Sequence, residues 1–249
     1  MNIYETKTVS QLLSGNSYPG RGVIMGKSPL GKAVIGYFIM GRSENSRNRI
    51  FEEDEKGNVY TKPFDESKVG DPSLIIYRAI AQYEDKIVVT NGDQTDTIVD
   101  GLAAGKTARE ALFTREFEPD APNFTPRISG VLTKNGTDFG YEMSILKSAD
   151  AEGTGCNRFF YDYKAVEGVG HLIHTYEENG SPLPTFQGEP RRIEIPESID
   201  DFFEELWGSL NEDNRISLYV EYFDLENDES ESIMINDNET RQFNEGILT

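Results

Sequence analysis

Three arginines are gathered within the nine residues from Gly41 to Arg49. The segment reads Gly-Arg-Ser-Glu-Asn-Ser-Arg-Asn-Arg, and Glu44 is its only acidic residue. Guanidinium groups so close together repel one another, yet each offers a planar set of donors that suits a phosphate or a carboxylate. Two interpretations follow for this arginine loop: it binds an anion, or it is a solvated loop whose arginines pair with acids elsewhere in the chain.

Two other polar clusters have the composition of a binding site. The first, residues 91–96, reads Asn-Gly-Asp-Gln-Thr-Asp and comes directly after an apolar run that is typical of a strand. The second, residues 118–128, contains three prolines, which fix the backbone and remove donors, so we expect a stiff, non-helical segment. The alternatives are an ordinary turn and a proline-rich connector. In the binding interpretation the stiff segment would position Glu118, Asp120, Asn123, Thr125 and Arg127.

The charge of the chain limits the kinds of partner it can have. It carries 24 basic and 44 acidic residues, for a net charge of −20, yet residues 1–51 contain seven bases and only two acids. A strongly acidic protein is a poor candidate for general nucleic-acid binding, because phosphate contacts supply most of that affinity. We therefore expect no nucleic-acid partner, whereas a small anion in a local cationic pocket is compatible with this charge.

Composition also bears on location and cofactors. The N-terminal residues lack the basic and apolar regions of a signal peptide, and no apolar run approaches the roughly 18 residues of a membrane span. These features predict a cytoplasmic protein without a membrane partner. A single cysteine, Cys156, and two histidines leave no metal-ligand cluster, so no metal site is expected.

Hydrophobic patterning predicts the elements that would position the polar clusters. A hairpin of strands is expected over 21–26 and 33–40, with the arginine loop following its second strand. A helix is expected from Asp71-Pro72 to Tyr83, and the charged segment 52–68 is expected to be a surface excursion. Further strands are expected over 86–90, 128–133, 139–147, 158–164, 169–176, 191–195, 215–223 and 232–236, and further helices over 97–117 and 198–210.

No repeat, low-complexity block or clear linker divides the chain, so we expect one domain over residues 1–249. Its C-terminal helix–strand portion, from about residue 197, carries sixteen acidic and two basic residues. We expect this portion to present a solvated acidic surface.

The order and spacing of the motifs resemble the IMP cyclohydrolase family of the archaeal-type purine pathway. The resemblance covers roughly residues 18–180, and for the portion beyond about 197 no match is assigned and any role stays open. It is carried by Arg21, the arginine loop ending in Arg47-Asn48-Arg49, the segment around Tyr77, Thr90-Asn91-Gly92 with Thr95-Asp96-Thr97, residues 123–128, and Thr175-Tyr176-Glu177.

The resemblance implies an α+β fold, a four-layer αββα sandwich of two antiparallel sheets similar to N-terminal-nucleophile hydrolases. It implies an enzyme that closes the ring of 5-formamidoimidazole-4-carboxamide ribonucleotide to give IMP, without a metal or organic cofactor. The partner would be this purine ribonucleotide, and a homo-oligomer stays open. Nucleophile hydrolases proper expose Cys, Ser or Thr as residue 1, whereas Met1-Asn2 begins this chain and Cys156 lies within it. Non-nucleophilic chemistry therefore fits better.

The same resemblance implies roles for individual residues. Tyr77 and Glu118 are the candidates for proton transfer, although the match at Glu118 needs a gap, and Arg49 is a third catalytic candidate. Phosphate would bind Arg21, Arg47 and Arg49. Other substrate-binding candidates are Arg42, Ser43, Asn48, Asn91, Thr95, Asp96, Asn123, Thr125 and Arg127. Two other functions are compatible with these residues: an amide hydrolase on the same scaffold, and a non-catalytic purine nucleotide-binding module.

Overall fold

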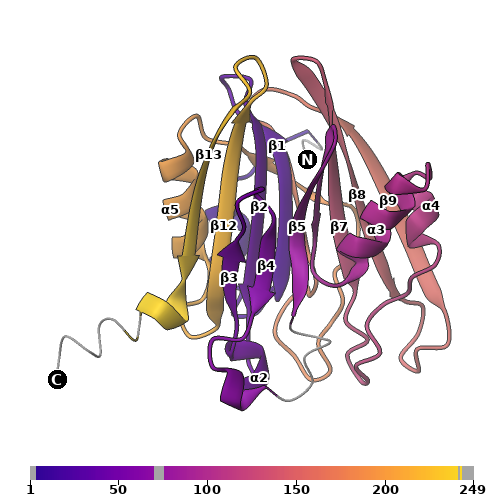
Figure 1. The fold of residues 1–249 in the computed structure, drawn as a ribbon. Coiled ribbons are helices and arrows are strands. Elements are labelled where there is room, and N and C mark those ends of the chain that lie inside the picture. The colour runs from indigo at the N-terminus through magenta and orange to yellow at the C-terminus, as the bar shows by residue number, and fades with distance from the viewer. Residues whose placement is uncertain (1–3, 70–75, 241, 243–249) are drawn as a thin grey trace.

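Two antiparallel sheets stack face to face and form the body of the protein (Figure 1). The structure is a computed structural model that describes residues 4–69, 76–240 and 242. One sheet has the strand order β11–β10–β1–β2–β12–β13, and the other runs from β3 to β9 in chain order. The six strands of the first sheet are β1 (Arg21–Lys27), β2 (Ala33–Met40), β10 (Val169–His174), β11 (Arg191–Glu194), β12 (Arg215–Asp224) and β13 (Glu229–Asn236).

The second sheet begins with two short strands and ends with three long ones. Its members are β3 (Ile50–Glu53), β4 (Val59–Lys62), β5 (Tyr77–Tyr83), β6 (Lys86–Thr90), β7 (Arg127–Asn135), β8 (Asp138–Ser148) and β9 (Cys156–Lys164). Hydrophobic patterning predicted each of the strands named here except three: β3, β4 and β5.

Side chains from both sheets meet in an inter-sheet core, which includes Val23, Tyr37, Val89 and Met143. Helices cover the two outer faces. α1 (Val9–Leu13) and α5 (Ile199–Ser209) pack on the six-stranded sheet, and α3 (Gln94–Ala103) and α4 (Ala108–Leu112) pack on the seven-stranded sheet (Figure 1). The predicted αββα layering is therefore confirmed. Because both faces of the six-stranded sheet are covered, β2 is buried at every position and reads as a continuous apolar run.

The prediction of a helix that ends at Tyr83 is wrong for residues 77–83, the part of it that the structure assigns to a strand. Residues Tyr77–Tyr83 form β5, which pairs antiparallel with β6 through contacts such as Ile80 with Val89. The predicted cap at Asp71-Pro72 lies outside the described residues. A short run that is apolar on all sides is compatible with either a buried helix or a buried strand, and here the neighbouring strands decide in favour of the sheet.

Two other expectations also need correction. The supposed surface excursion at 52–68 includes part of β3, all of β4 and a short 3₁₀ helix at Glu66–Lys68. The helix expected over 97–117 is two helices, α3 and α4, which are separated by a turn at Gly105 with φ of +75°. The capping box is nevertheless present, since Thr107 and Glu110 exchange hydrogen bonds at the start of α4.

The acidic C-terminal portion is built into the first sheet. β12 lies between β2 and β13, and residues 33–40 of β2 pair with it over most of their length. Within the described ranges, the helices are all too short or too polar to cross a membrane.

Candidate active site

The arginine loop lies beside a cavity of about 280 Å³ at one end of the sandwich. Segments far apart in the sequence meet there, because the ends of β1, β2, β7 and β10 lie at this end of the two sheets. Eight of the residues expected at the site line the cavity: Arg21, Arg42, Ser43, Arg49, Glu118, Asp120, Asn123 and Thr125.

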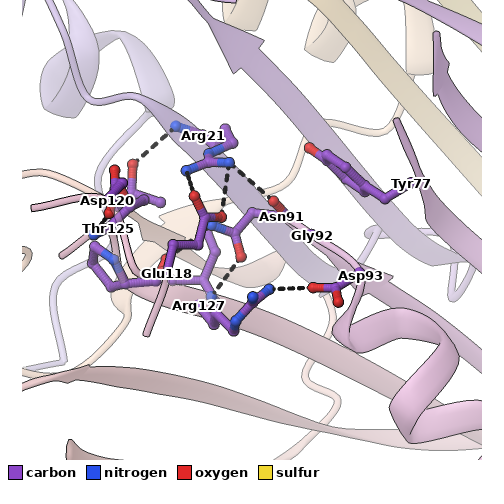
Figure 2. A network of polar contacts seen from close by, with 12 residues as sticks. Arg21, Tyr77, Asn91, Gly92, Asp93, Glu118, Asp120, Thr125 and Arg127 are labelled. Carbon is purple, nitrogen blue, oxygen red and sulfur yellow. Dashed lines mark hydrogen bonds and ion pairs between the residues drawn. The ribbon is translucent and has the colours of Figure 1, made fainter. Parts of the chain in front are cut away.

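Arg21 and Glu118 form a buried ion pair on the cavity wall (Figure 2). Arg21 Nη1 lies 3.1 Å from Glu118 Oε1, and Nη2 lies 3.3 Å from Oε2, so the two side chains meet fork to fork. Arg21 also donates to the carbonyl oxygen of Asn91 at 3.1 Å. Burial raises the pKa of Glu118, while the nearby guanidinium groups of Arg21 and Arg127 act in the opposite direction. A buried carboxyl group in this balance is suited to exchanging protons with a ligand.

The stiff segment holds Glu118 in place through bonds within its own loop. The Glu118 amide donates to the Thr125 carbonyl oxygen at 2.9 Å, and the Thr125 amide donates to Asp120 Oδ1 at 2.7 Å. The Thr125 hydroxyl lies 2.5 Å from both Asp120 Oδ2 and the hydroxyl of Tyr176. Asn123 Oδ1 accepts from the amide of Leu183 at 3.1 Å, which joins this segment to the loop after β10.

Arg49 is the most deeply buried of the three arginines that line the cavity. Arg49 is 4% exposed, and within the described residues its guanidinium donates only to two backbone carbonyl oxygens, those of Ser46 at 2.8 Å and Met40 at 2.9 Å. No acid in the described part of the chain forms an ion pair with it. A guanidinium of this kind on the wall of a cavity has donors of the geometry that suits a phosphate or a carboxylate.

Arg42 and Ser43 stand on the arginine-loop side of the same cavity. Arg42 donates to Asn179 Oδ1 and to the carbonyl oxygen of Gly180, and it stacks over the ring of Tyr18 at 4.8 Å. Ser43 caps α2 (Glu44–Arg47), because its hydroxyl accepts from the Ser46 amide at 3.1 Å. Arg42 therefore has neutral partners only, and its charge adds to that of Arg49.

Tyr77 lies behind Arg21 and does not line the cavity. Its hydroxyl is 2.7 Å from that of Tyr37, and both rings belong to the inter-sheet core. Figure 2 shows the Tyr77 hydroxyl directed toward the Arg21 guanidinium. Burial, followed by the influence of Tyr77, raises the pKa of Tyr37 far above its ordinary value, so the Tyr37 phenol stays protonated.

Two members of the arginine loop point away from the cavity. Arg47 donates to the carbonyl oxygen of Asp213 and to Asn214 Oδ1, and Asn48 exchanges two hydrogen bonds with the backbone of Asp65. Both side chains fix the loop to neighbouring segments.

The Asn91 cluster, residues 91–96, does not line the cavity but supports a residue that does, because Arg21 donates to the Asn91 carbonyl oxygen. Asn91 Nδ2 donates to the Pro126 carbonyl oxygen, and its Oδ1 accepts from the Ile128 amide, so this side chain joins β6 to β7. Thr95 bonds the hydroxyl of Thr90 at 2.7 Å.

The remaining two predicted residues are occupied by ion pairs. Arg127 donates to Asp93 Oδ1 at 2.6 Å and to Gln94 Oε1 at 2.8 Å (Figure 2). Asp96 pairs with Arg78 at 2.6 Å on the surface. Arg127 is close enough to influence Glu118 without lining the cavity.

Sequence reasoning missed an aromatic wall. Tyr18 and Tyr176 both line the cavity, and their rings stack with centroids 5.9 Å apart and planes inclined by 18°. Tyr176 stood within a family-like motif, and Tyr18 lies in a turn-rich segment where only its residue type gave a signal. Such a wall is suited to the flat face of a heterocycle.

The fold and the cavity define an αββα protein with a partly aromatic pocket that three arginines line. Within residues 4–69, 76–240 and 242, no three metal-ligating side chains come together. A family model described as IMP cyclohydrolase-like protein matches residues 18–229. This chain belongs to the IMP cyclohydrolase-like family, which confirms the resemblance inferred from its motifs.

Individual relatives agree with this family. A protein of Methanopyrus kandleri named IMP cyclohydrolase is 33% identical over 165 residues, which are 65% of this chain and 76% of the relative. A protein of the same name from Methanocella arvoryzae is 28% identical over 207 residues, 75% of this chain and 96% of the relative. For the Methanococcus maripaludis protein, also named IMP cyclohydrolase, identity is 33% over 128 residues, and the match spans only 62% of that relative's length.

Proposed function

We propose that this protein is an IMP cyclohydrolase, which closes the ring of 5-formamidoimidazole-4-carboxamide ribonucleotide to IMP with loss of water. The observation that carries the proposal is Arg49, a buried guanidinium on the cavity wall whose only described acceptors are backbone carbonyl oxygens. The phosphate of the ribonucleotide would supply the missing negative charge. Arg42 and the hydroxyl of Ser43 would complete its surroundings.

The chemistry is an intramolecular condensation. The carboxamide nitrogen forms a bond to the formyl carbon, and the formyl oxygen departs as water with one proton from each of the two nitrogens. The reacting groups are already tethered, so holding them face to face supplies a large part of the rate enhancement. The stacked rings of Tyr18 and Tyr176 would hold the imidazole plane in the orientation this reaction needs.

We assign proton exchange to Glu118, whose carboxyl group is buried beside Arg21. Tyr77 would donate a hydrogen bond to the oxyanion that develops on the formyl oxygen. A hydroxyl has one proton to donate, so if Tyr37 donates to Tyr77, the Tyr77 proton is free for the substrate. Tyr37 would then be a positioning residue. These roles need a small displacement of Arg21 or of the substrate, because Tyr77 lies behind Arg21.

Two related proposals concern the chain as a whole. We propose that residues 1–249 act as one domain, since β12 lies inside the first sheet and joins the C-terminal portion to β2. We further propose that the protein acts in the cytoplasm on this free nucleotide.

The reaction product distinguishes this function from the two alternatives. Cyclisation of the formamido ribonucleotide produces a purine absorbance change, an amide hydrolase releases formate, and a binding module does neither. We expect cyclisation with a chelator present. Loss of activity on chelation that a divalent ion restores would contradict the cofactor-free mechanism.

The role of Arg49 has its own test. Arg49→Gln should weaken binding of the ribonucleotide by about 1.5–3 kcal/mol, the range for hydrogen bonds to charged groups. The corresponding nucleoside, which lacks the phosphate, should bind both proteins equally. Arg78→Gln is the matched control, because Arg78 pairs with Asp96 outside the cavity. Equal losses for nucleotide and nucleoside would show that Arg49 does not contact the phosphate.

A further inference from the structure

A second cavity, of about 430 Å³, opens at the edge of the sandwich formed by β9, β10 and β11. β9 and β11 are the terminal strands of their sheets, and the segment around Lys7 lies beside β11 through a bridge to Ile193. The residues that line this cavity are all different from those that line the Arg49 cavity. The two cavities are therefore separate sites on the molecule.

His171 is a buried donor on the wall of this second cavity. It is 8% exposed, its ring stacks on Tyr163 with centroids 3.6 Å apart, and its Nδ1 lies 2.8 Å from the hydroxyl of Tyr141. Burial, followed by the charge of Arg192, lowers the pKa of His171 to about 4, so the imidazole is neutral at neutral pH. Burial also raises the pKa of Tyr141, which keeps its hydroxyl proton.

The contact with Tyr141 bears on which ring nitrogen of His171 carries the proton. Nδ1 lies 2.8 Å from the Tyr141 hydroxyl and either atom can be the donor, so the direction is an assignment: we take the hydroxyl as the donor, because Nδ1 is its one acceptor among the residues that the structure describes. A neutral imidazole that accepts at Nδ1 carries its proton on Nε2. This Nε2–H has no partner within the described residues, so it is available as a donor to a bound molecule.

Cations surround this donor. Lys7, Lys164 and Arg192 line the cavity, and none of them forms an ion pair with a described residue. The Nε atom of Arg192 is buried, and no described residue is its hydrogen-bond partner. Glu5 and Glu189 also line the cavity, so the cations exceed the acids even though the chain as a whole has a net charge of −20.

We propose that this cavity is a second ligand site, which binds the phosphoryl group of a small phosphorylated molecule through His171 Nε2–H and the Arg192 guanidinium. Both groups only donate hydrogen bonds, which suits phosphate oxygens and excludes a cation. The volume lies in the range of about 300–1,000 Å³ that is usual for small-molecule sites, so the site has room for an organic portion beside Val169 and Pro190. This site is additional to the cyclohydrolase site proposed above.

The two histidines of the chain allow a direct test by NMR. Imidazole ¹⁵N resonances would be followed while inorganic phosphate or ribose 5-phosphate is added at constant ionic strength. We expect a saturable shift of the His171 resonances. His174 is the internal control, because its Nδ1 is engaged by the Tyr176 carbonyl oxygen and it lies outside the second cavity. Equal affinity for both probes would indicate a site for free phosphate, and at least tenfold tighter binding of ribose 5-phosphate would indicate a phosphorylated metabolite.

Variants assign the shift to this cavity. Arg192→Gln should weaken the affinity for the probe, measured from the His171 shift, at least tenfold. Lys164→Gln, which changes an exposed side chain, should weaken this affinity severalfold. Arg49→Gln should leave it within twofold, because Arg49 lines the other cavity. No saturable shift of His171 with either probe, or a response that follows Arg49 and not Arg192, would overturn the proposal.

Discussion

Replacing either member of the Arg21–Glu118 pair should destabilise the protein, but the two replacements should differ in their dependence on pH. Both side chains are buried, with 10% and 7% of their surface exposed. Glu118→Gln removes the carboxylate from beside the Arg21 guanidinium, which cannot lose its proton. The carbonyl oxygen of Asn91 is then the acceptor that Arg21 keeps unchanged. Removing one partner of a buried ion pair typically costs about 3–5 kcal/mol. Since glutamine keeps one oxygen for Arg21, we expect a loss near 3 kcal/mol at pH 5. This loss should shrink as the pH rises, because the raised pKa of Glu118 makes the native protein itself lose stability when the carboxyl group ionises, whereas glutamine does not titrate.

Arg21→Met instead leaves a buried carboxyl group, which can bind a proton. Burial already raises the pKa of Glu118, and removing the cation raises it further. The folded chain then holds this proton more tightly than the unfolded chain does. The penalty for the buried carboxylate is therefore absent below the ordinary carboxyl pKa of 4.5, and it grows as the pH rises toward the higher pKa of the folded state. Arg21→Met should lose distinctly more stability at pH 8 than at pH 5.

The measurement is urea unfolding at pH 5 and pH 8, followed by the fluorescence of Trp207, the single tryptophan. In thermal unfolding of the same variants, a loss of 3 kcal/mol corresponds to a fall in Tm of about 6–12 °C for a chain of this size. The control is Glu52→Gln, which breaks the exposed pair of Glu52 with Lys62 and should cost less than about 1 kcal/mol. If Glu118→Gln costs no more than this control, or if both buried variants depend on pH alike, the reasoning is refuted.

Three other substitutions test other buried groups. Tyr77→Phe should reduce turnover by about 10²–10³, the scale for one oxyanion donor, with little change in substrate binding. Tyr37→Phe should reduce turnover less. Normal turnover in Tyr77→Phe would show that the Tyr77 ring serves packing only. Burial raises the pKa of Glu221 to about 7, so the native protein should lose stability as the pH rises from 4.5 to 7. Glutamine cannot ionise, so the free energy of unfolding of Glu221→Gln in urea should rise by about 2.5 kcal/mol relative to that of the native protein between pH 5 and pH 8. A difference between the two proteins that does not depend on pH would contradict the raised pKa of Glu221.

Much of the framework could be predicted from the sequence, because the signals are local. The apolar run 33–40 and the hairpin before it appear as β1 and β2, and Ser198 caps α5 as its residue type indicates. The error at Tyr77–Tyr83 has a physical cause, since apolar residues on every side describe a buried segment without giving its period. Only pairing with β4 and β6 selects the strand.

The direction of each side chain in the arginine loop could not be predicted. Within the loop, residues Glu44–Arg47 form one turn of helix, and successive side chains on a helix point about 100° apart. Arg47 consequently points toward residues 213 and 214, while Arg42 and Arg49, on either side of the turn, line the cavity. Residue spacing gathers the three cations, but the short helix decides which of them meet a ligand. Likewise, Tyr37 gave no signal in sequence, because a tyrosine in an apolar strand looks like ordinary core.

The uneven pairing of the arginines favours a ligand as the reason for their arrangement. Among the partners that the structure describes, Arg21 has a carboxylate, Arg42 has two neutral oxygens, and Arg49, which is 4% exposed, has only backbone carbonyl oxygens. A shortage of acids does not explain this, since the chain contains 44 of them. An uncompensated buried charge opposes folding by several kcal/mol, so the free protein is less stable than it would be with a carboxylate beside Arg49. A phosphate bound beside Arg49 would remove this penalty and gain charge-assisted hydrogen bonds in the same position. The free energy that the uncompensated charge subtracts from folding would then contribute to binding. A phosphorylated ligand should therefore raise the free energy of unfolding of the native protein more than that of the Arg49→Gln variant.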